Sequence, residues 1–145
     1  MSKTILLVED SEDDAVLFER ALNASGAPGS LKIASDGRKA IEYLTHAMDG
    51  GSPDYPFPHL VLLDLKLPYV LGLDVLKWIR SQPALQSLIV IVLTSSRQES
   101  DVEQAYRLCA NSYLVKPSTL DELVRMVRSL GDYWFGHNQT IALLR

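Results

Sequence analysis

The stretch Leu60-Val-Leu-Leu63, followed directly by Asp64, decides the fold of this 145-residue chain. Its four successive apolar residues do not alternate with polar ones, which is typical of a strand that helices bury on both faces in a parallel sheet. Other short runs have the same character, at residues 5–8, 31–34, 88–93 and 112–115. We therefore predict an α/β fold built on a five-stranded parallel sheet.

Amphipathic segments between these runs predict the helices. Ser11 is a suitable N-cap for the first helix, and the three acids at residues 12–14 fall in its first turn, where the helix dipole favours negative charge. Thr119 and Glu122 have the capping-box spacing at the start of the fifth helix. The other helices are expected at about residues 37–48, 73–81 and 99–109. Five β-α units result.

The C-terminal part of the chain divides into a helix and a tail. Apolar residues at spacings of three and four predict the stripe that packs on the sheet: Leu120, Leu123, Val127, Leu130 and Trp134. We interpret Trp134 as a core residue. The group Ile141-Ala-Leu-Leu144 has no place in a five-unit core. We therefore expect a domain over residues 1–134 and a C-terminal tail or dimerisation arm over residues 135–145.

Composition narrows the class of protein. With 47% apolar residues, 145 residues suit one domain with a real core. The net charge of -4 disfavours nucleic acid as a partner, and no apolar run approaches the roughly 20 residues that cross a membrane. The single cysteine, Cys109, excludes an intrachain disulfide, and the start of the chain does not resemble a signal peptide. A cytoplasmic protein is expected.

Polar residues follow four of the predicted strands. Glu9 and Asp10 follow the first strand, Asp64 the third, Thr94 the fourth and Lys116 the fifth. Ligands bind beyond the carboxyl ends of the strands in open parallel sheets, so these side chains should share one rim. Three carboxylates crowded together repel one another, and a hard divalent cation such as Mg²⁺ relieves that repulsion. The pattern predicts a metal site.

The same rim suits phosphoryl chemistry. A carboxylate beside Mg²⁺ can attack phosphorus, and Asp64 is our candidate nucleophile. Lys116 and the Thr94 hydroxyl are suited to bind phosphoryl oxygens. Singly, an acidic pair is most often a helix cap and a Lys-Pro dipeptide is usually a turn. Their joint occurrence at separate strand ends is what favours a site.

The chain resembles the receiver domains of two-component response regulators. The resemblance covers about residues 3–134 and rests on four motifs: Ile5-Leu-Leu-Val-Glu-Asp10, Leu62-Leu-Asp64-Leu-Lys-Leu-Pro68, Leu93-Thr94-Ser95 and Ser112-Tyr-Leu-Val-Lys116-Pro117. It implies a flavodoxin-like (βα)5 doubly wound parallel sheet with strand order 2-1-3-4-5. It also implies a phosphoacceptor with autodephosphorylation rather than a dedicated enzyme, with Asp64 phosphorylated by a histidine kinase.

Further roles follow from the resemblance alone. It implies that Mg²⁺ is held by Asp10, Asp64 and the backbone carbonyl of Lys66, with Glu9 joining through water. Thr94 and the aromatic residue Tyr113 would switch the face formed by the fourth helix, fifth strand and fifth helix. Without the resemblance, Tyr113 is better interpreted as an ordinary half-buried strand tyrosine. The Lys116–Pro117 peptide bond is expected to be cis by the same analogy.

Two positions depart from the family pattern. Cys109 stands where a glycine is usual, which we expect to affect packing. Lys66 lies two places after the acceptor, where side chains influence the lifetime of the phosphoryl group. The stretch from Cys109 to Pro117, the long loop before the third strand and Tyr133-Trp-Phe135 are similar to single-domain regulators paired with phytochrome-type kinases. A homodimer is expected through the fourth-to-fifth-helix face and the tail.

Three other functions were weighed. A phosphohydrolase using Asp64 is disfavoured because Lys66 stands where its acid/base aspartate belongs. A flavin-binding electron carrier is disfavoured because the acidic loop at residues 9–14 would repel a phosphate. A phosphorylation-independent pseudo-receiver, acting as a protein interaction module, remains the alternative, although the acceptor, metal acid, threonine and lysine positions are all intact.

Overall fold

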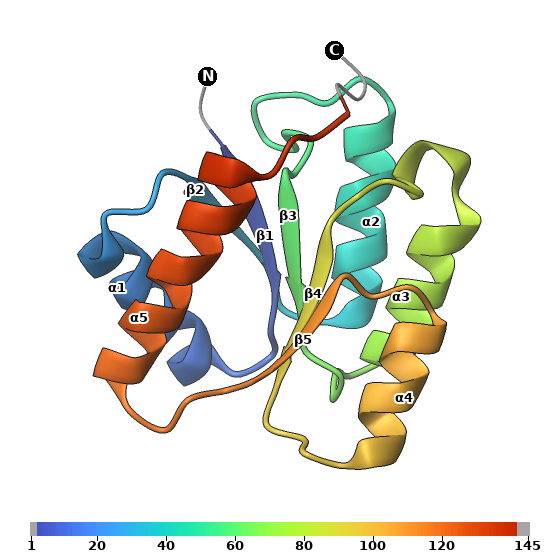
Figure 1. Cartoon of the computed structure of the whole chain (residues 1–145). Coiled ribbons are helices and arrows are strands. Elements are labelled where there is room, and N and C mark those ends of the chain that lie inside the picture. The colour runs from blue at the N-terminus through green and yellow to red at the C-terminus, as the bar shows by residue number, and fades with distance from the viewer. Residues whose placement is uncertain (1–2, 142–145) are drawn as a thin grey trace.

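The computed structural model describes residues 3–141, and within them one parallel sheet forms the centre of the molecule (Figure 1). Its strand order is β2-β1-β3-β4-β5, as expected for a flavodoxin-like fold. The strands are β1 (Thr4–Val8), β2 (Ser30–Ala34), β3 (Leu60–Leu63), β4 (Val90–Thr94) and β5 (Ser112–Val115). The strand β4 begins two residues later than predicted and includes Thr94 as its last residue. The apolar residues Leu88 and Ile89 belong to the approach to the strand.

Five α-helices connect the strands within residues 3–141: α1 (Glu12–Ser25), α2 (Gly37–Met48), α3 (Gly72–Ser81), α4 (Glu99–Arg107) and α5 (Leu120–Leu130). The expected caps form, since the side chains of Ser11 and Thr119 accept hydrogen bonds from the backbone N–H groups of Asp14 and Glu122. A short 3₁₀ turn, η1 (Pro83–Leu85), precedes β4, and a π-helical segment, η2 (Gly131–His137), follows α5.

The helices form two layers, one on each face of the sheet. Figure 1 shows α1 and α5 together on one face and α2, α3 and α4 on the other. Alternate strand residues serve the two layers: Ile5 and Leu7 pack toward α1 and α5, whereas Leu6 and Val8 pack toward the opposite helices. This double burial explains why the strands read as continuous apolar runs. The predicted α5 stripe, including Trp134, belongs to the core between the sheet and the layer of α1 and α5.

The helix continues beyond residue 134, where we expected the tail to begin. Phe135 packs against the same core as α5, and the π-helical segment extends to His137. Ile141 is 64% exposed at the end of the described chain. The remaining apolar residues of the proposed arm, Ala142, Leu143 and Leu144, lie outside the described residues.

One expectation about the backbone needs correction. The Lys116–Pro117 bond is trans, and none of the peptide bonds within residues 3–141 is cis. The trans form is favoured intrinsically, and Lys116 reaches its partners with it. Cys109, where the resemblance implies a glycine, has a φ of 67°, a left-handed backbone conformation that glycine adopts without strain. No helix in the described part of the chain combines the length and apolarity needed to cross a membrane.

Candidate functional site

The predicted site residues meet at the carboxyl edge of the sheet. Asp64 directly follows β3, Thr94 ends β4, and Lys116 directly follows β5. The N-terminus of α3 packs closely against Asp64, because a Cβ atom on Gly72 would overlap the backbone oxygen of Asp64. Only glycine therefore fits this position.

Both carboxylate oxygens of Asp64 are engaged. The Thr94 hydroxyl donates to Oδ1 at 2.8 Å, and the Lys116 ammonium donates to Oδ2 at 3.0 Å. The backbone N–H of Lys66 makes a longer bond of 3.4 Å to Oδ1, while the Lys66 side chain is exposed. Asp64 is 7% exposed and Thr94 is fully buried, so charge at this carboxylate is compensated by protein groups rather than by bulk water.

Lys116 bridges three carboxylates. Its Nζ lies 2.6 Å from Glu9 Oε1, 2.8 Å from Asp14 Oδ2 and 3.0 Å from Asp64 Oδ2. Burial alone would lower the pKa of Lys116, but its hydrogen bonds to Asp14, Glu9 and Asp64 raise the pKa overall. The side chain therefore stays protonated and supplies a fixed positive charge beside Asp64.

Asp14 was not among the residues that we predicted for the site. It is one of three consecutive acids in the first turn of α1, and we had attributed all three to the helix dipole. Only one of them can face the carboxyl edge of the sheet, since successive helix residues point about 100° apart. The docking of α1 selects Asp14, and the spacing of the acids in the sequence holds no signal that separates it from Glu12 and Asp13.

Three acids form a cluster with the composition of a divalent metal site. Oxygen atoms of Glu9, Asp10 and Asp64 all lie within 4.8 Å of one another. Glu9 is 4% exposed, and its burial raises the pKa of the carboxyl to about 6 against the opposing hydrogen bond from Lys116. Asp10 is exposed and opens the cluster to solvent. An all-oxygen set with one accessible member suits a hard cation that keeps part of its water shell.

The aromatic residue Tyr113 is linked to the loop that follows β4. Its hydroxyl donates to the backbone oxygen of Ser96 at 3.0 Å, and its ring packs against the core on the α3 and α4 side. Burial raises the pKa of this phenol. Ser96 in turn donates to Asp101 at 2.5 Å. The loop between Thr94 and α4 is thus tied at one end to Asp64 and at the other to Tyr113, and sequence reasoning missed Ser96 and Asp101 as its anchors.

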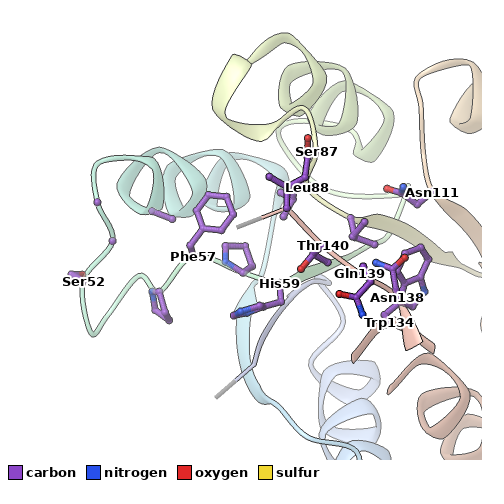
Figure 2. A pocket seen from close by; sticks show the side chains of 17 residues that line it. Ser52, Phe57, His59, Ser87, Leu88, Asn111, Trp134, Asn138, Gln139 and Thr140 are labelled. Atoms are coloured by element: carbon purple, nitrogen blue, oxygen red, sulfur yellow. The ribbon is translucent and has the colours of Figure 1, made fainter. Parts of the chain in front are cut away.

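A separate cavity of about 620 Å³ lies at the opposite, amino-terminal edge of the sheet. Figure 2 shows side chains from the loop before β3, from the approaches to β4 and β5 and from the segment after α5 around this cavity, among them Phe57, Leu88, Asn111 and Trp134. It shares no residue with the acidic site. Residues 138–141 form part of its wall, so this part of the tail folds over its own chain.

Curated relatives match nearly the whole chain. The probable methanogenesis regulatory protein FilR2 of Methanothrix harundinacea is 40% identical over 136 residues, which cover 94% of this chain and 86% of that protein. Response regulator Rcp1 of Synechocystis sp. is 40% identical over 132 residues, which cover 91% of this chain and 88% of that protein.

Solved structures agree with these relatives. The Mn²⁺-bound form of Rcp1 has a TM-score of 0.83 at 38% identity and covers 97% of this chain and 99% of its own. The phosphorylated cyanobacterial phytochrome response regulator RcpA has a TM-score of 0.86 at 33% identity and covers 98% of this chain and 100% of its own. The sequence profile of the response regulator receiver domain matches residues 5–128. With the fold, the acidic edge and these similarities taken together, this chain belongs to the response regulator receiver domain family.

Proposed function

We propose that the chain is a phosphoryl-accepting response regulator in which Asp64 receives the phosphoryl group of a phosphohistidine on a sensor histidine kinase. The observation that carries this proposal is the pair of contacts at Asp64, with the Thr94 hydroxyl on one oxygen and the Lys116 ammonium on the other. A hydroxyl donor and an ammonium can together stabilise the negative charge on the oxygens of a transferred phosphoryl group.

In the proposed reaction an oxygen of Asp64 forms a bond to phosphorus while the bond between phosphorus and the kinase histidine nitrogen breaks. The nitrogen keeps the bonding electrons, and the product is an aspartyl phosphate. The Thr94 hydroxyl then donates to one phosphoryl oxygen and Lys116 pairs with another, in place of their present contacts with the free carboxylate. We also propose autodephosphorylation, in which water attacks the phosphorus and the bond from phosphorus to Asp64 breaks, so that the chain acts as a phosphoacceptor rather than as a dedicated enzyme.

Mg²⁺ is the proposed cofactor. Asp10, Asp64 and the backbone carbonyl of Lys66 would hold it, with Glu9 acting through water. When bound, the ion offsets negative charge on the incoming phosphoryl oxygens. The cluster of Glu9, Asp10 and Asp64 supports this assignment, and so does the Mn²⁺-bound form of the similar protein Rcp1.

The proposed output is a change at the face formed by α4, β5 and α5. Thr94 and Tyr113 are the proposed switch residues, and the loop between them supplies the physical link, because Tyr113 bonds to the backbone two residues after Thr94. A phosphoryl group that draws Thr94 closer would pull this loop and the Tyr113 ring with it. The same face is the proposed homodimer contact.

The proposed upstream partner is a histidine kinase of the phytochrome type. This rests on the similarity to Rcp1 and to RcpA, which is described as a phytochrome response regulator. The exposed apolar residue Leu17 of α1 lines a hollow beside Glu9 and Lys116 and offers a contact surface for such a kinase. We propose that the protein is cytoplasmic and that neither nucleic acid nor a membrane is among its partners.

The deciding experiment is intact-protein mass spectrometry after incubation with acetyl phosphate and Mg²⁺. Wild type should gain one hydroxylamine-labile phosphoryl adduct, and Asp64→Asn should gain none because the nucleophilic carboxylate is gone. Asp74→Asn is the matched control, since Asp74 is an exposed aspartate on α3 outside the site and should be phosphorylated like wild type. Absence of an adduct on folded wild type with any small phosphodonor would instead support the pseudo-receiver alternative.

A further inference from the structure

Asp14 holds the Lys116 ammonium from outside the acidic cluster. It lies on α1, its side chain is 42% exposed, and it is separate from the three acids whose oxygens gather within 4.8 Å. The distance of 2.8 Å to Lys116 Nζ lies between those of Glu9 and Asp64. An ammonium has three N–H donors, so each of the three carboxylates can take one of them.

These three contacts do not have the same fate when a cation binds. Glu9 and Asp64 belong to the cluster that suits a divalent ion, and an ion there competes with Lys116 for their oxygens. Asp14 is outside this competition. If the Lys116 ammonium lost its contacts with Glu9 and Asp64 and had no contact with Asp14, its charge would be poorly compensated. Such a charge is costly because the Lys116 side chain is only 20% exposed.

From this geometry we propose that Asp14 is a positioning residue, an inference that rests on the proposed function. Asp14 keeps Lys116 beside Asp64 while a divalent cation displaces the Lys116 ammonium from Glu9. Asp14 thereby lowers the free energy needed to admit the cation and keeps the ammonium within reach of the phosphoryl oxygens. This assigns Asp14 a role that its two acidic neighbours on α1 do not share.

Mg²⁺ binding to the unphosphorylated protein tests the idea without any phosphoryl transfer. The dissociation constant is obtained from the rise of the unfolding midpoint with Mg²⁺ concentration. Asp14→Ala should raise it about tenfold, as expected for loss of one charge-assisted hydrogen bond. Asp13→Ala, which removes an exposed acid one residue earlier, should raise it only about twofold through the screened loss of charge.

A double-mutant cycle with Lys116→Ala separates positioning from general electrostatics. Without Lys116 there is no ammonium to retain, so Asp14→Ala should then raise the dissociation constant no more than Asp13→Ala does. Asp14→Glu, which keeps a carboxylate within reach of Lys116, should restore the wild-type constant to within about threefold. Equal effects of Asp14→Ala with and without Lys116, or no Mg²⁺ binding to wild type, would overturn the proposal.

The rate of adduct formation with acetyl phosphate at saturating Mg²⁺ provides a second measurement. Asp14→Ala should lower the rate constant about tenfold with the donor concentration for half-maximal rate unchanged, because the displaced ammonium acts on charge that develops during transfer. A phosphorylated wild type with an additive cycle would refute only the role of Asp14. A coupled cycle without any adduct would refute only the proposed function.

Discussion

Glu9 is a buried carboxylate that lies close to two other acids. It is 4% exposed, accepts hydrogen bonds from Ser11 and Lys116, and lies within 4.8 Å of carboxylates from Asp10 and Asp64. Burial raises its pKa to about 6, and the charge on Asp64 acts in the same direction. In the metal-free protein, the ionised carboxylate of Glu9 therefore lowers the stability of the folded state. This is expected at a site where a bound cation would offset the negative charge.

The raised pKa of Glu9 makes a prediction about pH in metal-free protein. Its folded-state pKa of about 6 exceeds the ordinary value of 4.5, so the folded protein binds more protons than the unfolded chain between these pH values. This contribution to stability is complete below pH 4.5 and is lost as the pH rises through 6. It amounts to about 2 kcal/mol, since one pKa unit corresponds to about 1.4 kcal/mol.

Urea unfolding of wild type and Glu9→Gln in EDTA, across this pH range, measures the effect. As the pH rises, the unfolding free energy of wild type should fall relative to that of Glu9→Gln, because the amide does not ionise. Glu12→Gln, at an exposed acid of α1, should follow wild type throughout. Parallel curves for wild type and Glu9→Gln would show that Glu9 ionises normally in the folded protein.

At the scale of elements, Arg80 of α3 joins segments that are distant in the sequence. Its guanidinium donates to the backbone oxygens of Leu85, Gln86 and Leu88 around η1 and to that of Cys109 at the end of α4. Burial lowers its pKa. The left-handed conformation of Cys109 belongs to this junction, because the turn after α4 presents the Cys109 oxygen to Arg80.

We expect Arg80→Ala to lower the unfolding free energy by about 2 to 4 kcal/mol, since it leaves several backbone oxygens without their charged donor. Arg80→Lys should recover only part of the loss, because an ammonium cannot span the same acceptors. Arg107→Ala breaks only an exposed pair with Glu103 and should change stability by about 0.5 kcal/mol or less. Equal losses in the Arg80 and Arg107 variants, measured by denaturant unfolding, would refute the role of Arg80 as a clamp.

At the scale of the whole molecule, the edge strand β5 and helix α5 present a partly apolar face. The β5 side chains are only half-buried, and a shallow groove between the two elements is lined by Leu114, Met126 and Leu130. Tyr133 borders the groove and is 53% exposed, and Tyr106 of α4 is 49% exposed. Unpartnered apolar surface of this kind supports the proposed homodimer contact.

Light scattering at micromolar concentration tests this contact. Wild type should have the mass of a dimer, and Met126→Glu should shift it to a monomer because a carboxylate would be placed in the apolar groove. Val16→Glu, at an exposed apolar residue on α1 outside this groove, should remain dimeric. A wild-type monomer both before and after phosphorylation would refute the dimer.

Much of this architecture was predictable because it depends on short-range patterns. Continuous apolar runs follow from burial on both faces of a parallel sheet, and the caps at Ser11 and Thr119 are local hydrogen bonds. The convergence of Asp64, Thr94 and Lys116 also follows from chain order, since parallel strands end at one edge. The start of β4 was placed too early because Leu88 and Ile89 are apolar but lie before Val90, the first residue of the strand.

Long-range geometry decided the rest. Which of the three acids on α1 reaches Lys116 depends on how that helix is rotated against the sheet, and the first-turn pattern is the same for all three. The hydrogen bond from Tyr113 to Ser96 and the contact of Arg80 with the Cys109 oxygen likewise depend on segments that meet only after folding. Residue type and spacing were therefore enough to predict the fold and the meeting of Asp64, Thr94 and Lys116 at one edge of the sheet. The partners of each charge were determined by packing between helices and sheet.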